Sequence, residues 1–284
     1  MKNLWILIIT ITILGCNKST KKENESIDPK DNTPEAIPVE PDGGIGDGAL
    51  SIMDNYILQI EKAHQKTAFL KHKAVSFNID IYFGGKQRLD GKITMLTNAT
   101  KIRIDKKDDS KLIYTNQKVY LCPKEANDKG ARFDMFTWTY FFGFPYKLDD
   151  PGTQWELQNV KTLNEVEHQT AKLTFEKGIG DSSEDWYIIY SDPNDHTLKA
   201  AAYIVTFGNQ DDTSKAEGDP HIIQYKKFKI IDGIPFATKW EFYGWSEEKG
   251  STDKIGEATL TDITFLEDEG TIFETPENAK EIML

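Results

Sequence analysis

The chain has 284 residues, of which 38% are hydrophobic and 28% charged, so it holds enough apolar material for a substantial core beneath a polar surface. Lys and Arg total 34 against 46 Asp and Glu, and the resulting net charge of -12 argues against a nucleic-acid binder, because phosphate binding needs a positive face. Two cysteines exclude a disulfide-dense scaffold and a zinc site built from four cysteines.

The first segment has the pattern of an export signal. Lys2 precedes an apolar run over residues 4–14, which is shorter than the roughly twenty residues of a membrane-spanning helix. The run ends in Ile13-Leu14-Gly15-Cys16, which resembles the lipobox of bacterial lipoproteins. The resemblance implies a signal peptide over residues 1–15, cleavage before Cys16 and lipidation of that cysteine. The alternatives are an ordinary cleaved signal with a chance cysteine, or an uncleaved anchor.

Residues 16–48 predict a lipid anchor followed by a disordered tether. The segment is rich in polar residues, proline and glycine and cannot bury enough apolar surface to offset its ordering entropy. As a flexible coil it would span about 30 Å on average. Asn17 follows the anchor cysteine, and by resemblance to the best-known sorting scheme, where Asp retains lipoproteins in the inner membrane, it favours the outer membrane. The sequence leaves the periplasmic or surface face open.

Residues 49–65 predict an amphipathic helix. Met53, Tyr56, Ile57, Ile60 and His64 fall on one helical face. Asp47 or Ser51 could cap its N-terminus. His64 lies on the apolar face, so we expect a structural histidine rather than a catalytic one.

The remaining chain predicts strands. Apolar side chains alternate with polar ones over residues 75–83, the pattern of a half-buried strand. Asp192-Pro193-Asn194-Asp195 predicts a turn, and Asp232-Gly233 predicts a two-residue hairpin. The other predicted strands cover residues 88–97, 100–106, 111–116, 118–122, 155–160, 170–175, 186–190, 200–207, 222–231, 234–245 and 257–266.

This order of elements predicts a mainly β (α+β) protein. Helices and strands do not alternate, which argues against a parallel sheet, and no blade-like repeat suggests a propeller. The expected architecture is a large curved antiparallel sheet or incomplete β-barrel that packs against the N-terminal helix. A sandwich and a closed barrel remain alternatives.

The most unusual segment, residues 133–146, contains eight aromatic side chains and no clean polar alternation. We expect a short helix or irregular loop that is largely buried. It could fill the core, line a pocket for a lipid-like ligand as a lid, or present a surface to a glycan or peptide. The candidate ligand-lining residues are Phe136, Trp138, Tyr140, Phe141, Phe142 and Phe144.

A resemblance to known families rests on segments spread over the predicted domain, residues 49–284. They are Lys62-Ala63-His64, Val75-Ser76-Phe77, residues 140–145, 148–152 and 178–185, Asp232-Gly233-Ile234-Pro235 and residues 272–276. The chain resembles uncharacterised lipoproteins of Bacteroidetes-type bacteria, and the order of its elements resembles the half-barrel of LolA/LolB-type carriers. That resemblance implies that an N-terminal helix and a mid-chain helical lid cover the concave face of the sheet.

No pattern for enzyme chemistry stands out. The chain lacks a Gly-x-Ser-x-Gly elbow, a His-Glu-x-x-His pair and a phosphate-binding glycine loop, so we expect no enzyme, no cofactor and no metal. Cys122 lies in an apolar stretch and is expected to be an inert buried thiol. Asp181, Glu184 and Asp185 are expected to be solvated turn carboxylates, and calcium ligation by this loop is left open.

The sequence therefore predicts a membrane-anchored envelope lipoprotein that binds or hands over a lipid or other apolar ligand in its concave face. Its expected partners are the membrane, through the lipid on Cys16, and an apolar small molecule. The alternative is a non-enzymatic envelope module that binds protein or glycan. An apolar cavity lined by residues 133–146 would favour the first, and a filled space would favour the second.

Overall fold

The computed structural model describes residues 50–208 and 212–283. The expected signal peptide, Cys16 and the tether lie outside the described residues. The helical elements are α1 (Ile52–Ala63), α2 (Lys66–Phe69), α3 (Ala131–Gly143), the 3-10 turn η1 (Phe144–Tyr146) and α4 (Ser214–Glu217). The strands are β1 (Ala74–Phe83), β2 (Lys86–Leu96), β3 (Ile102–Lys106), β4 (Lys111–Thr115), β5 (Lys118–Cys122), β6 (Thr153–Leu163), β7 (Val166–Phe175), β8 (Tyr187–Ser191), β9 (Leu198–Tyr203), β10 (His221–Ile231), β11 (Ile234–Ser246), β12 (Gly250–Leu266) and β13 (Lys280–Ile282).

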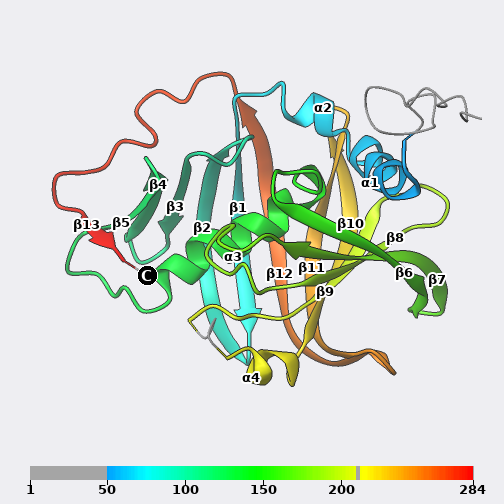
Figure 1. The fold of residues 1–284 in the computed structure, drawn as a ribbon. Coiled ribbons are helices and arrows are strands. Elements are labelled where there is room, and N and C mark those ends of the chain that lie inside the picture. Colours follow the sequence, from blue (N-terminus) through cyan, green and yellow to red (C-terminus); the bar gives the residue numbers. More distant parts are fainter. Residues whose placement is uncertain (1–49, 209–211, 284) are drawn as a thin grey trace, which may run out of the picture. The chain divides into compact units, whose positions relative to one another are not determined.

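The strands form one 13-stranded sheet in the order β13-β5-β4-β3-β2-β1-β12-β11-β10-β9-β8-β7-β6. Every pairing is antiparallel, and most join strands that follow one another in the chain. The pairing of β1 with β12 joins the two halves of the sheet, with Ile81 opposite Ala258. The predicted open antiparallel sheet is therefore confirmed (Figure 1).

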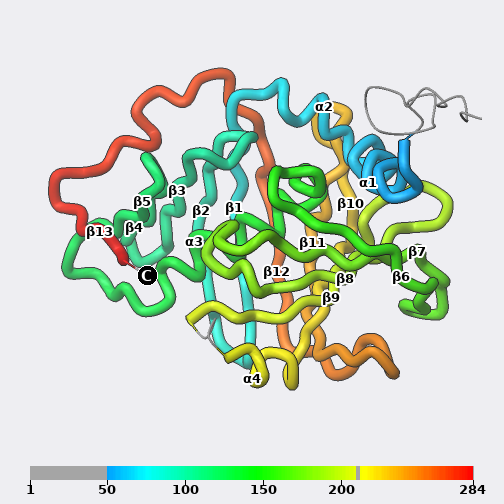
Figure 2. The backbone as a smooth tube through the Cα atoms, viewed as in Figure 1, coloured from blue at the N-terminus to red at the C-terminus, as the bar shows by residue number. Residues whose placement is uncertain are grey.

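The hairpin between β10 and β11 forms where the sequence predicts it. Asp232 and Gly233 both have positive φ angles, 50° and 80°, as a type I′ turn requires. This turn sets the register in which Ile231 pairs with Ile234. β13 was not predicted, because its three residues are too few to show an alternating pattern. It pairs with β5 and places the C-terminal segment beside that edge (Figure 2).

The N-terminal helix is confirmed and is shorter than expected. Ser51 caps α1 by accepting a hydrogen bond from the backbone N–H of Asp54 at 3.0 Å. The helix buries Tyr56, Ile57 and Ile60, the middle of its predicted apolar face. Among the described residues, no helix has both the length and the apolarity needed to cross a membrane.

The aromatic segment forms α3 and η1, and the sheet curves around this helix. Phe142 stacks on Phe77 of β1, with ring centroids 4.1 Å apart, and on Phe236 of β11. Phe141 meets Tyr203 of β9 at 5.0 Å, while α3 also contacts β3, β4 and β5. Strands from both halves can meet one helix only if the sheet bends around it (Figure 1). A helix that is apolar on most sides is stable in such a buried position.

Candidate functional site

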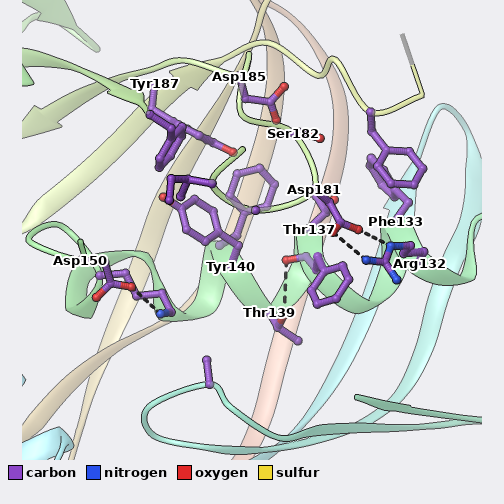
Figure 3. A pocket seen from close by; sticks show the side chains of 18 of the residues that line it. Arg132, Phe133, Thr137, Thr139, Tyr140, Asp150, Asp181, Ser182, Asp185 and Tyr187 are labelled. Carbon is purple, nitrogen blue, oxygen red and sulfur yellow. Dashed lines mark hydrogen bonds and ion pairs between the residues drawn. The ribbon is translucent and has the colours of Figure 1, made fainter. Parts of the chain in front are cut away.

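A partly open cavity of about 610 Å³ lies beside α3. This volume falls within the usual range for small-molecule sites. Its walls come from α3, the β3–β5 side of the sheet, the turn at residues 147–153, the loop at residues 176–186 and the β7–β9 side (Figure 3). The aromatic side chains on the walls include Phe133, Phe136, Tyr140, Phe175, Tyr187 and Phe207.

Helix α3 divides its aromatic side chains between the core and the cavity. Residues three or four apart share a face of a helix, and the cavity face carries Phe133, Phe136 and Tyr140. The opposite face carries Asp134 and Trp138, which are buried against the sheet. The segment therefore fills the core with one face and lines a cavity with the other, and its expected role in binding a ligand stays a prediction.

The six candidate ligand-lining residues do not all reach this cavity. Phe136, Tyr140 and Phe141 line it. Trp138, Phe142 and Phe144 are buried in the core, and Phe142 also borders a separate void of about 20 Å³. Sequence reasoning missed Phe175, Tyr187, Tyr203 and Phe207 on the cavity wall, because they lie on other strands and loops and carry no local signal of it.

A buried carboxylate fixes the N-terminal half of α3. Asp134 is 1% exposed and accepts a hydrogen bond from the indole N–H of Trp138 at 2.9 Å. Its two oxygens also pair with Arg88 of β2 at 2.8 Å and Lys106 of β3 at 3.2 Å. The helix is thereby held to β2 and β3 by two ion pairs, while the contact with Trp138 lies within the helix.

The loop at residues 176–186 closes one side of the cavity. Asp181 forms a bidentate ion pair with Arg132, whose Nη2 lies 2.8 Å from Asp181 Oδ1 (Figure 3). The Arg132 guanidinium also lies over the Phe136 ring. Ile179 packs against Gly152, where an added Cβ would lie only 2.7 Å from Ile179 Cγ1. These contacts join the loop to α3 and to the turn at residues 147–153.

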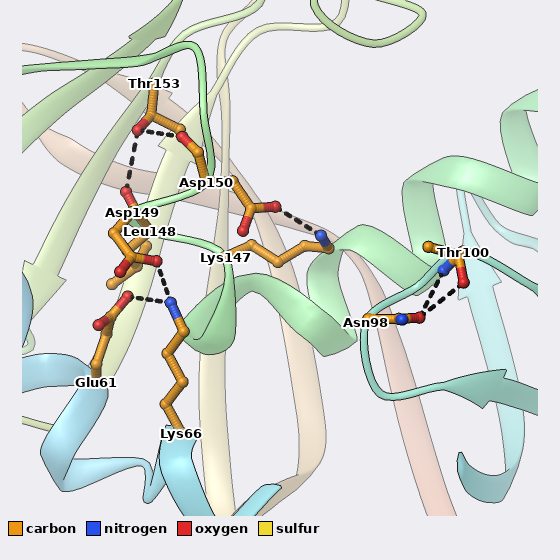
Figure 4. A network of polar contacts seen from close by, with 9 residues as sticks. All are labelled: Glu61, Lys66, Asn98, Thr100, Lys147, Leu148, Asp149, Asp150 and Thr153. Atoms are coloured by element: carbon orange, nitrogen blue, oxygen red, sulfur yellow. Dashed lines mark hydrogen bonds and ion pairs between the residues drawn. The ribbon is translucent and has the colours of Figure 1, made fainter. Parts of the chain in front are cut away.

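A polar network anchors the turn on the other side (Figure 4). Lys147 pairs with Asp150 at 2.7 Å. Lys66 of α2 binds both Glu61 and Asp149, so the turn is joined to the N-terminal helices. Burial disfavours the charged form of Asp149, but the contact with Lys66 outweighs it and lowers the pKa of the carboxyl.

One wall of the cavity carries a half-buried acidic group, Asp185. Asp185 Oδ1 accepts hydrogen bonds from the backbone N–H and the hydroxyl of Thr206, both at 2.7 Å. Burial raises the pKa of Asp185 to about 6. Burial also raises the pKa values of Tyr140, Tyr187 and Tyr203, and the nearby Asp185 charge raises each further. A polar spot therefore interrupts an otherwise aromatic wall.

The carboxylates that could have ligated calcium do not converge. Asp181 binds Arg132, Asp185 binds Thr206, and Glu184 is exposed. Across residues 50–208 and 212–283, no group of three or more His, Cys, Asp or Glu side chains could hold a metal ion.

The remaining candidates for chemistry have structural contacts. Cys122 is 8% exposed, and its thiol donates to Asn278 Oδ1 at 3.0 Å. His64 is 2% exposed, and its Nε2 accepts from the backbone N–H of Leu198 at 2.8 Å, the contact of a structural histidine.

Comparison with known proteins identifies one matching family and several similar structures. Residues 82–232 match a family model described as "Family of unknown function (DUF6503)". A search of curated protein sequences gives no match. Among solved structures, the chain is similar to a LolA superfamily protein from Nitrosomonas europaea, with a TM-score of 0.51, 8% identity, and coverage of 80% of this chain and 99% of that chain.

Two further structures are similar over much of the chain. One is a domain provisionally described as an outer membrane lipoprotein-sorting protein from Vibrio parahaemolyticus (TM-score 0.40, 9% identity, covering 77% of this chain and 97% of that chain). The other is a DUF1329 family protein from Desulfovibrio piger (TM-score 0.40, 13% identity, covering 76% and 96%). The similarity to the Nitrosomonas europaea protein confirms the predicted LolA-like fold.

Proposed function

Because this chain belongs to DUF6503, a family of unknown function, we propose its role from the cavity itself: it binds an apolar ligand, such as a lipid or an acyl chain, beside α3. One observation carries the proposal. A cavity of about 610 Å³ remains open among aromatic walls although the core face of the same helix is tightly filled. The binding energy would come from burial of methylene groups, about 0.8 kcal/mol each.

The ligand enters, in this proposal, by movement of the loop at residues 176–186. Helix α3 is held by its core aromatic rings and by the contacts of Asp134, so it is the fixed wall of the cavity. The loop is held to α3 by the Arg132–Asp181 pair and to the turn at residues 147–153 by the packing of Ile179 on Gly152. Both contacts can break without disturbing the sheet.

We further propose that the protein works in the cell envelope without catalysing a reaction. The pattern of residues 1–16 supports a cleaved signal and lipidation of Cys16, with residues 16–48 as a tether and a domain from residue 49 onward. The LolA superfamily fold agrees with such a setting. An anchored protein of this kind receives or holds its ligand at the outer membrane and does not shuttle across the periplasm.

Binding of the neutral dye N-phenyl-1-naphthylamine, which fluoresces in apolar surroundings, tests the proposal. We expect saturable binding to the purified protein. Thr137→Trp, which adds a large side chain on the cavity face of α3, should weaken binding about tenfold or more, because it fills the space. Tyr82→Ala is the control, since Tyr82 is 49% exposed and lies away from the cavity.

The absence of dye binding, or equal binding by the Thr137→Trp variant with an unchanged melting temperature, would refute the proposal. The interaction module would then become the better candidate. Its support is β6, the last strand of the sheet, which exposes Leu157 and Val160. A sheet edge of this kind can pair with a strand of a partner protein.

A further inference from the structure

The charges on the cavity wall are unbalanced. Arg132 is paired with Asp181, and Lys147 is paired with Asp150. Asp185 also lines the cavity, and no cation pairs with it among the described residues. When Asp185 is ionised, the cavity therefore carries one negative charge that no protein cation neutralises.

Two polar atoms on this wall have no hydrogen-bond partner within the described part of the chain. Thr206 occupies Oδ1 of Asp185 with two donors, while Oδ2 takes no hydrogen bond and is not a buried atom, so a ligand or water can reach it. The hydroxyl of Tyr140 is buried and equally without a partner. A buried polar atom left unpaired is costly, so such atoms in a native structure can mark the place of a ligand group.

Aromatic rings surround the same wall. The ring of Tyr187 lies 5.5 Å from that of Tyr140, 6.1 Å from that of Phe175 and 6.1 Å from that of Tyr203. The faces of aromatic rings attract cations, and several rings around a carboxylate make a typical site for an ammonium group. Figure 3 shows Asp185 beside Tyr187, on the wall that faces α3.

We propose that the ligand is an amphiphile with an amine head, which binds at Asp185 and the Tyr140 hydroxyl while its apolar tail lies along α3. This inference rests on the proposed function. A protonated amine would donate to the Asp185 carboxylate, and the Tyr140 hydroxyl would take up one of its remaining donors. An anionic head would meet the unneutralised Asp185 carboxylate, since Arg132 and Lys147 are already paired.

Three probes with the same ten-carbon tail test this inference: decylamine, decanol and decanoate. Each is titrated at pH 7.5, below its micelle concentration, against protein loaded with N-phenyl-1-naphthylamine. We expect decylamine to compete at least about tenfold more strongly than decanol, the usual effect of a charge-assisted hydrogen bond, and decanoate to compete least.

Two matched variants locate the effect. Asp185→Asn should reduce the advantage of decylamine over decanol to about twofold or less, because the neutral amide keeps the shape and loses the charge. Glu184→Gln should retain the advantage, since that carboxylate belongs to the same loop but is exposed and does not line the cavity. Tyr140→Phe removes only the hydroxyl and should weaken decylamine more than decanol.

The outcomes separate the two proposals. If the dye does not bind and no probe competes, the proposed function fails. If all three probes compete equally, or decanoate competes best, the cavity binds apolar ligands and the amine inference is wrong. The order of the three probes on the unaltered protein gives this answer even where a variant fails to fold.

Discussion

Removal of the Asp134 carboxylate should destabilise the protein more than the loss of an exposed ion pair does. Asp134→Ala leaves Arg88, Lys106 and the indole N–H of Trp138 without their common partner. Breaking a buried ion pair by removing one member costs about 3–5 kcal/mol. The side chains of Arg88 and Lys106 are 32% and 17% exposed, so water can reach both, and we expect the lower end, about 3 kcal/mol.

Urea unfolding followed by fluorescence measures this loss directly. For a domain of this size, about 3 kcal/mol corresponds to a fall in melting temperature of roughly 6–12 °C. Asp90→Ala is the control, because Asp90 pairs with Lys107, whose side chain is 79% exposed, and such a pair contributes about 1 kcal/mol or less. Equal losses in the two variants would refute the argument that α3 is held by a buried charge.

Three further predictions concern other parts of the structure. Gly152→Ala should lower the free energy of unfolding in urea by about 1–2 kcal/mol, because the φ angle of Gly152 is +89° and the new Cβ would clash with Ile179. Adding Ile179→Ala should restore only the share of this loss that comes from the clash, because the backbone strain remains. Burial lowers the pKa of His64 to about 4, so on acidification the unfolded chain takes up a proton at a higher pH than the native protein does. The free energy of unfolding, measured relative to the His64→Gln variant, should therefore fall by about 3 kcal/mol as the pH drops from about 6.5 to 4. A difference between the two proteins that does not change with pH would contradict this. Cys122 should react with iodoacetamide only as the protein unfolds, and rapid labelling of the native protein by mass spectrometry would contradict its burial.

Local sequence patterns predict most of the sheet, because each strand carries its own signal. The alternation over residues 75–83 gives β1, and Asp232-Gly233 gives the hairpin that follows β10. Helix α3 is less well predicted, since a segment that is apolar on most sides suits a helix or a buried loop equally. Only the curvature of the sheet decides which face of α3 packs into the core.

The candidate site is harder to predict for the same reason. Phe136 and Trp138 are two residues apart in the sequence, yet one lines the cavity and the other is buried in the core. Asp185 belongs to an acidic loop that looks solvated in the sequence. Its partial burial depends on Thr206 and on rings from other elements, Tyr140 of α3 and Tyr203 of β9, which only the folded chain brings together.

The pairing of β1 with β12 limits how early the chain can fold while it is being synthesised. β1 ends at residue 83, and its partner on that edge begins only at residue 250, so nearly the whole domain must be synthesised before this pair can form. Contacts so distant in sequence fold slowly, and an unpaired strand edge invites aggregation meanwhile. A growing chain that has passed α3 still lacks β11, which supplies Phe236 to that helix. A chaperone that shields β1 until β12 emerges would therefore raise the yield of folded protein, and a chain cut before residue 250 would lack β12 and leave the two halves of the sheet unjoined.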